Sequence, residues 1–229
     1  MKFVKQRIHL TVKNCNELSA DKKDSIVHSP LLPNSIRALI VGPSNCGKIN
    51  VIISLIVGKN GLKFKNIYTY SKSLYQAKYQ FLKKVIDPIQ GLNLYTLSEN
   101  DAVITPDKAK PHSIFIFDDV ICGKQCAIRD YFCMGRHKKI DCFYLCQTYT
   151  KIPKHLIRDN ANMILIFKQD ELNLKHIFND HIIGDMDFKK FLKICHECWK
   201  EKHQFVMIST DSLINNDRYG KGFDSFIQL

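Results

Sequence analysis

The sequence predicts one α/β domain in which helices flank both faces of a mainly parallel central sheet. Short apolar runs alternate along the chain with segments of helical periodicity, and strands that alternate with helices join into parallel sheets through right-handed crossovers. A glycine-rich loop stands between the first strong apolar run and the helical segment after it. Strand, glycine loop and helix in this order are typical of a three-layer fold that binds ligands at the end of its sheet.

The expected strands are short apolar runs bounded by polar residues, as buried central strands are. They are 36–41, 66–70, 113–120, 140–146, 163–167 and 205–209, with weaker candidates at 8–12 and 92–97. Helices are expected at 50–57, 74–86, 171–179 and 188–200, and the residues after 209 are expected to form a loose tail. We expect residues 1–34 to be an N-terminal leader and residues 35–229 to form the domain, with its motifs in 35–170 and its completion in 171–229.

The composition is that of an ordinary globular protein, because 45% of the 229 residues are hydrophobic and 24% are charged. This balance excludes wholesale disorder. No apolar stretch approaches the roughly 18 residues that a membrane-spanning helix needs. The segment Met1–Lys5 lacks the apolar core of a secretory signal, so we expect a soluble intracellular protein without a membrane partner.

The net charge of +12 is concentrated in two stretches. Residues 59–84 hold seven lysines and no acid, and residues 129–158 hold seven lysines or arginines against Asp130 and Asp141. Basic surface of this kind suits a polyanionic partner, of which nucleic acid is the commonest. A solvated lysine-rich face is the alternative interpretation.

The loop from Gly42 to Lys48 has the pattern G-x-x-x-x-G-K, whose backbone N–H groups wrap a polyphosphate while the lysine reaches the outer phosphates. The next position usually carries Ser or Thr, whose hydroxyl binds Mg²⁺, and here it is Ile49. Asn50 points about 100° further around the helix and is a poor substitute. We therefore expect nucleotide binding with turnover at least about tenfold slower than in an Ile49→Thr variant. The residues expected to bind the nucleotide are Gly42, Pro43, Ser44, Asn45, Cys46, Gly47, Lys48, Ile49 and Asn50.

A second group of candidate residues follows the apolar runs at 113–120 and 140–146. Asp118 is expected at the end of its strand, where a carboxylate can hold Mg²⁺, and Asp119 can orient and deprotonate an attacking water. Gln147 ends the later run and can place an amide near the γ-phosphate. These residues indicate an ATPase that uses ATP and Mg²⁺.

An arginine from a neighbouring subunit can neutralise charge in the transition state. We favour Arg136 for this role over Arg158 and Arg129. An arginine that faces solvent or DNA remains the alternative.

Five motifs occur here in the order found in one family, and together they resemble the poxvirus-type genome-packaging ATPases of the FtsK–HerA superfamily, including those of virophages and Maverick/Polinton elements. The resemblance covers roughly residues 34–170. Its motifs are Gly42 to Lys48, Phe117-Asp118-Asp119, Gly135-Arg136-His137, Gln147-Thr148 and Pro153-x₄-Arg158-x-Asn160.

The resemblance implies a P-loop NTPase that forms a homo-oligomeric ring and drives double-stranded DNA into a preformed capsid. It implies that Lys48 binds phosphate, Asp118 holds Mg²⁺, Asp119 acts as the base and Gln147 senses the γ-phosphate. The partners would be capsid components and DNA bound without sequence preference. Such a protein would act in the host cytoplasm or nucleus where virions assemble, or in the virion.

Two other functions remain open. Because of Ile49, the chain could be a hydrolysis-deficient nucleotide-binding subunit with a structural or DNA-binding role, or a decayed copy of an element. A small-molecule or nucleotide kinase shares the glycine loop, but Asp118-Asp119 followed by Gln147 suits activation of water.

Overall fold

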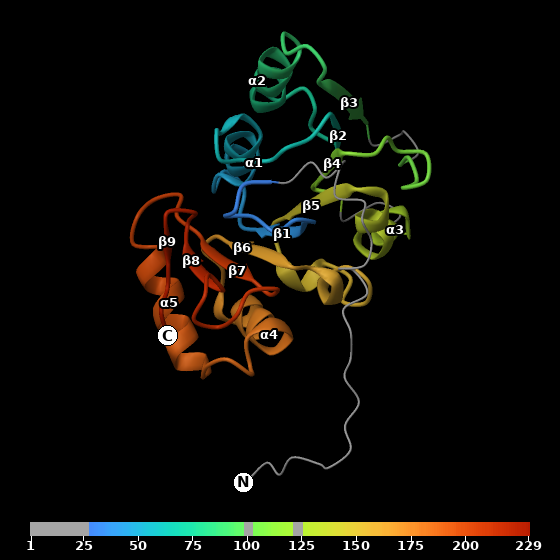
Figure 1. Ribbon diagram of the computed structural model, residues 1–229. Helices are drawn as coiled ribbons and strands as arrows, with labels where there is room; N and C mark the ends of the chain where they lie inside the picture. Colours follow the sequence, from blue (N-terminus) through green and yellow to red (C-terminus); the bar gives the residue numbers. More distant parts are fainter. Residues whose placement is uncertain (1–27, 99–102, 121–125) are drawn as a thin grey trace, which may run out of the picture.

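The computed structural model describes residues 28–98, 103–120 and 126–229, which form one sheet between two layers of helices (Figure 1). The nine strands lie in the order β3-β2-β4-β5-β1-β6-β7-β8-β9. Neighbours from β3 to β6 in this order are parallel, and the last three strands are antiparallel. The strands are β1 (Arg37–Val41), β2 (Asn66–Ser71), β3 (Asn93–Leu97), β4 (Ser113–Asp118), β5 (Ile140–Cys146), β6 (Met163–Ile166), β7 (Val206–Ser209), β8 (Tyr219–Lys221) and β9 (Ser225–Phe226).

Helices cover the two faces of the sheet in separate groups. One apolar cluster, which we call the α1 cluster, joins one sheet face to α1 and α2. A second cluster joins the other face to α3, α4 and α5. This arrangement confirms the predicted three-layer α/β fold with a mainly parallel sheet. The helices are α1 (Lys48–Val57), α2 (Ala77–Ile86), α3 (Cys126–Met134), α4 (Glu171–His181) and α5 (Phe188–Cys198).

The strand β5 shows why the apolar runs became central strands. Phe143 and Leu145 pack in the α1 cluster, whereas Cys142 and Tyr144 pack in the opposite cluster. Both sets are fully buried, so neither face of the strand meets water. A strand buried on both faces needs apolar residues at every position, which is the pattern that predicted it.

The last part of the chain departs from the prediction. The expected loose tail is wrong, because residues 219–221 and 225–226 form β8 and β9. These strands have three and two residues and include Gly220, so they are too short to show an alternating pattern. The antiparallel part of the mainly parallel sheet is confined to this end, since β7 returns beside β6 and each later strand reverses direction.

Smaller differences concern the ends of helices. The helix expected from residue 74 begins at Ala77, the one expected to reach residue 200 ends at Cys198, and α3 had not been predicted. The expected strand at 8–12 lies outside the described residues. Within the described ranges, no helix is both long and apolar enough to cross a membrane.

The described end of the expected leader packs against the domain. His28 is buried, accepts the backbone N–H of Lys63 at Nδ1 (3.0 Å) and donates from Nε2 to Asp141 (2.8 Å). Asp141 also accepts the backbone N–H of Ile36 at 2.7 Å, just before β1. These contacts fix the chain where it enters the sheet, while the domain limits at residues 34, 35 and 170 stay predictions.

Candidate nucleotide-binding site

The predicted site residues other than Arg136 converge at the carboxyl ends of three adjacent strands. The strand β5 lies between β4 and β1, so the segments that follow these strands meet at one edge of the sheet. They line a cavity of about 260 Å³. Its lining includes Ser44, Asn45, Gly47, Lys48, Ile49 and Asn50 from the loop and α1, with Asp118, Asp119 and Gln147 opposite.

The loop from Gly42 to Gly47 has a backbone that suits an anion. A Cβ at Gly42 would lie 2.6 Å from both Cys46 Sγ and Phe167 Cβ, so no side chain fits there. Asn45 and Gly47 have φ of 61° and 114°, the left-handed region that turns successive N–H groups toward one point. The first turn of α1 carries no acidic residue, which leaves its N-terminal dipole available to a phosphate. The cradle therefore fits a polyphosphate.

The Lys48 side chain folds back over its own loop. Its Nζ donates to the carbonyl oxygens of Gly42 at 2.6 Å and Pro43 at 3.0 Å. These carbonyls hold the ammonium group at the mouth of the cradle, within the lining of the cavity. A bound phosphate would replace neutral carbonyl oxygens with charged acceptors, which form stronger hydrogen bonds.

Ile49 occupies the first turn of α1 with a buried hydrocarbon side chain. It is 6% exposed and belongs to the apolar cluster that contains Ile52 and Leu145. The fold thus accommodates isoleucine at the position where Ser or Thr would present a hydroxyl. The side chain offers no oxygen to a metal ion, so the effect of Ile49 on turnover stays a prediction.

Asp118 is held by a residue that the sequence patterns did not indicate. The buried Tyr79 hydroxyl, from α2, donates a short hydrogen bond to Asp118 Oδ2. Burial, followed by the negative charge of Asp118, raises the pKa of Tyr79, so the phenol remains a protonated donor. Asp118 itself is 7% exposed. Its carboxylate suits Mg²⁺ by chemistry, because hard cations take oxygen ligands, and Tyr79 fixes its orientation.

Asp119 and Gln147 form a second polar pair at the cavity. Gln147 Nε2 donates to Asp119 Oδ2 at 3.4 Å, and both side chains are exposed. Asp119 has φ of 56°, and its backbone N–H donates to Leu145 O at 3.1 Å. Asp119 is in the left-handed conformation, and the two adjacent carboxylates have different hydrogen-bond donors. Tyr79 donates to Asp118, and Gln147 donates to Asp119.

Arg136 lies far from these groups within the same chain. It belongs to the short helix Gly135–Lys138, which precedes the amino end of β5, whereas the nucleotide cavity lies at the carboxyl end. Arg136 is exposed and borders another cavity with His28 and Asp141. In this position it is out of reach of a nucleotide in the cavity of its own chain, and its catalytic role stays a prediction.

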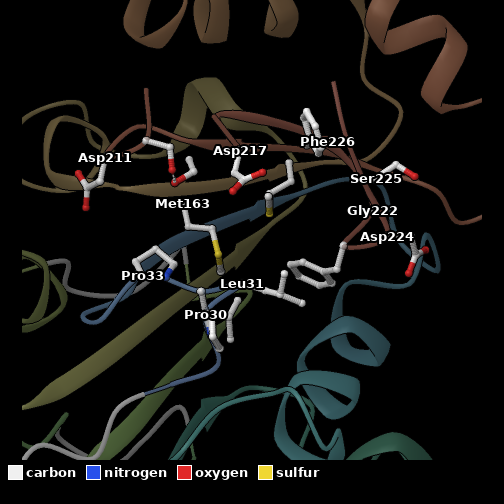
Figure 2. Close-up of a pocket in the computed structure, with 15 residues that line it drawn as sticks. Pro30, Leu31, Pro33, Met163, Asp211, Asp217, Gly222, Asp224, Ser225 and Phe226 are labelled. Carbon is white, nitrogen blue, oxygen red and sulfur yellow. Dashed lines mark hydrogen bonds between the residues drawn. The ribbon is translucent and has the colours of Figure 1, made fainter. Parts of the chain in front are cut away.

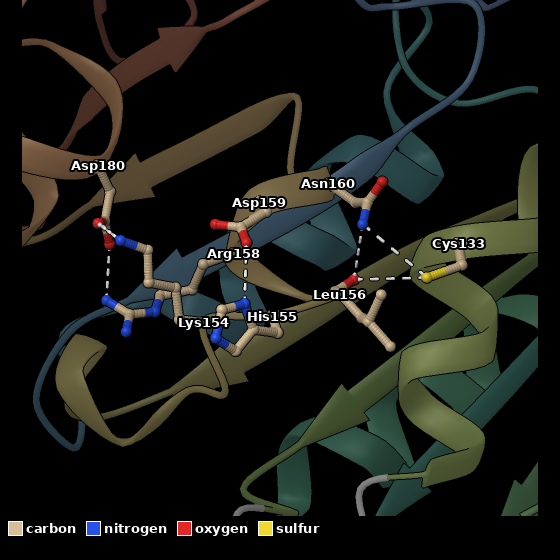
Figure 3. A network of polar contacts seen from close by, with 8 residues as sticks. All are labelled: Cys133, Lys154, His155, Leu156, Arg158, Asp159, Asn160 and Asp180. Carbon is tan, nitrogen blue, oxygen red and sulfur yellow. Dashed lines mark hydrogen bonds and ion pairs between the residues drawn. The ribbon is translucent and has the colours of Figure 1, made fainter.

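Arg158, the alternative arginine, is engaged within its own chain (Figure 3). Its Nη1 lies 2.7 Å from Asp180 Oδ2, and its guanidinium lies 4.9 Å from the centre of the Tyr149 ring. Burial opposes ionisation of Asp180, but the Tyr149 hydrogen bond and the Arg158 charge outweigh it and lower the pKa of this carboxyl. The Arg158 side chain is 12% exposed, as expected of a structural ion pair. Arg129 is half-buried on α3.

Several other residues of the site were not predicted. The N-terminal part of α2 and the loop before it bring Ser73, Gln76 and Lys78 to the cavity. His203 Nδ1 lies 3.1 Å from the Cys46 carbonyl oxygen. All of these contacts join segments that are distant in sequence, so no local pattern could indicate them.

No protein-family model matches the chain, and no curated protein sequence matches it. Solved structures do. The genome packaging NTPase B204 from Sulfolobus turreted icosahedral virus 2, in complex with ATP-gammaS, has 12% sequence identity over 86% of this chain and 100% of its own, with a TM-score of 0.52. The same protein with AMPPCP gives a TM-score of 0.55 at 12% identity, over 83% of this chain and 98% of its own.

A third structure agrees with these two. B204, the DNA-packaging ATPase from Sulfolobus Turreted Icosahedral Virus, has 15% identity over 83% of this chain and 97% of its own, with a TM-score of 0.55. The chain has the P-loop NTPase fold.

Proposed function

We propose that this chain is an ATP-hydrolysing motor of the FtsK–HerA superfamily that moves double-stranded DNA into a preformed viral capsid. The observation that carries the proposal is the meeting of the Lys48 loop, Asp118, Asp119 and Gln147 around one cavity. The likeness in fold to packaging NTPases solved with ATP-gammaS and AMPPCP supports it. The proposed partners are DNA and capsid components, in the host cytoplasm or nucleus where virions assemble, or in the virion.

The residues that line the cavity have different roles in the proposed hydrolysis. The loop N–H groups and Lys48 bind and orient the phosphates. Asp118, oriented by Tyr79, would hold Mg²⁺, which when bound neutralises charge on the phosphate oxygens. Asp119 accepts a proton from the attacking water. The amide of Gln147 donates to Asp119 in the structure and can instead donate to a phosphate oxygen when nucleotide is bound.

Exposed cations supply a surface for DNA. Lys59, Lys63 and Lys65 follow α1, and Lys83 and Lys84 lie on α2. All five are exposed, and such side chains bind the phosphate backbone without reading sequence. Lys78 lies on the same helix and borders the nucleotide cavity, so α2 carries both DNA-facing and nucleotide-facing residues.

A ring of identical subunits would complete the site. Head-to-tail contacts place different surfaces of two copies against each other. Arg136 lies at the edge of the sheet opposite the nucleotide cavity, which suits an arginine given to the next subunit.

A nucleotide-binding ring subunit that does not hydrolyse ATP is the second candidate. Ile49 favours it, because a buried isoleucine stands where a metal-binding hydroxyl is expected. This chain would then contribute its DNA-facing and subunit-facing surfaces but no turnover.

The deciding experiment measures ATP hydrolysis by the purified chain with and without linear double-stranded DNA, beside Ile49→Thr and Asp119→Asn variants. DNA-stimulated turnover that disappears in Asp119→Asn supports the motor. Turnover only in Ile49→Thr, at least about tenfold above the unaltered chain, supports the hydrolysis-deficient subunit. Failure of both the unaltered chain and the Ile49→Thr variant to bind ATP would refute both proposals.

A further inference from the structure

A second cavity of about 260 Å³ lies away from the nucleotide site, on strands β6 to β9 (Figure 2). We call it the acidic groove. The apolar residues of its lining include Leu31, Met163, Met207 and Phe226. Leu31 is 59% exposed and Phe226 60% exposed, so two large apolar side chains face solvent in one groove. The other apolar residues belong to or pack on the α1 cluster, so the groove continues that face of the sheet beyond α1.

All charged residues in the described lining of the groove are acidic. They are Asp211, Asp217 and Asp224, which Figure 2 shows spread along the groove opposite Pro30 and Leu31. The three aspartates are exposed, and among the described residues no lysine or arginine forms an ion pair with them. The two nearby cations are engaged elsewhere, because Arg218 pairs with Asp185 and Lys221 pairs with Glu201.

This charge is unusual for the molecule, whose net charge is +12. A surface that is apolar and acidic at once complements a segment that is apolar and basic. The sequence contains such a segment in residues 1–13, MKFVKQRIHLTVK. It holds no acidic residue, its cations are Lys2, Lys5, Arg7 and Lys13, and its apolar residues include Phe3, Val4, Ile8, Leu10 and Val12.

We propose that residues 1–13 of the chain dock in the acidic groove of the same chain. The lysines and Arg7 would face the aspartates, while the apolar residues would cover Leu31 and Phe226. Among the described strands β9 is the last on this side of the sheet, so the segment can also pair with its outer backbone edge.

The connection favours the groove of the same chain over that of a second copy. The described chain begins at His28, and Pro30 and Leu31 already line the groove. Residues 14–27 can span at most about 50 Å when extended, which allows the segment to return to the groove. A tether of this length holds the segment at an effective concentration of about millimolar, above that of any second copy in dilute solution.

The test is photo-crosslinking of the full-length chain with a benzophenone amino acid in place of Phe3, without DNA. The expected product is an intramolecular crosslink to a peptide that contains Met207 or Phe226, identified by mass spectrometry. The Asp217→Asn/Asp224→Asn variant should lower the crosslink yield about threefold at low salt, as expected for two exposed ion pairs. Asparagine is suitable at position 217, because Asp217 has φ of 61°.

The matched control is Asp87→Asn/Asp107→Asn, which removes two exposed acids outside the groove and should leave the yield unchanged. Circular dichroism would verify that each variant is folded. Crosslinks to other surfaces, or no crosslink, would overturn the proposal. Crosslinks between an isotope-labelled and an unlabelled copy would overturn the intramolecular assignment and give the groove to a neighbouring subunit.

Discussion

Replacing Tyr79 with phenylalanine removes one hydroxyl from the nucleotide site and leaves the ring in the apolar cluster. Asp118 Oδ2 then loses the hydrogen bond that fixes its carboxylate. A hydrogen bond to a charged group contributes about 1.5–3 kcal/mol. If about 1.4 kcal/mol of this stabilises the orientation that binds Mg²⁺, the affinity for Mg²⁺-nucleotide falls about tenfold. Affinity for the nucleotide without Mg²⁺ should not change, because the loop that holds the phosphates is untouched.

The assay is equilibrium binding of a fluorescent ATP analogue in Mg²⁺ and in EDTA. Tyr131→Phe is the matched control, since Tyr131 is also buried and its hydroxyl donates to the Ile104 carbonyl at 2.5 Å in the opposite apolar cluster. Both variants lose a buried hydrogen bond, so both should unfold more easily. Only Tyr79→Phe should lose Mg²⁺-dependent affinity. Equal affinities of the two variants in Mg²⁺ would refute the positioning role of Tyr79.

Three further predictions concern other parts of the molecule. Gly42→Ala should destabilise the fold by about 2 kcal/mol and abolish nucleotide binding, because its Cβ would overlap Cys46 and Phe167. Thermal melts and binding assays measure the two effects. The control Gly184→Ala, whose Cβ would meet nothing within 4 Å, should show neither effect. Burial lowers the pKa of His181 to about 4. The free energy of unfolding should therefore fall by up to about 3 kcal/mol as the pH drops from 6.5 to 4, because the unfolded chain binds a proton that the folded chain does not. His181→Gln should flatten this pH dependence in denaturant titrations. Arg136→Ala should reduce DNA-stimulated turnover at least about tenfold with stability and ATP affinity unchanged, and unaltered turnover would exclude the arginine from catalysis.

The parts of the site that lie on one continuous segment could be predicted from the sequence. The Gly42 to Lys48 pattern encodes its own backbone geometry, and the apolar run before Asp118 encodes a buried strand with a carboxylate at its end. The strand order then brought these segments together. Parallel strands present their carboxyl ends at one edge, which is why Gln147 also lies there.

Contacts between distant segments could not be predicted in this way. Tyr79 is 39 residues from Asp118. In the sequence it looks like any buried aromatic residue on the apolar side of a helix. The same holds for Arg158, whose partner Asp180 lies on α4. The strands β8 and β9 were missed for another reason, since two or three residues are too few to show a period.

The pairing of strand β5 has a consequence for the motor proposed above. It pairs with β1 along Cys142–Cys146 and with β4 along Ile140–Leu145, in one continuous register. A slip of one residue would exchange the buried faces of Tyr144 and Leu145, which the two apolar clusters forbid. The three strand ends under the nucleotide therefore behave as a single stiff platform. In the proposed motor, mechanical work would therefore come from segments beyond the strands or from movement of whole subunits, because the paired strands resist slipping.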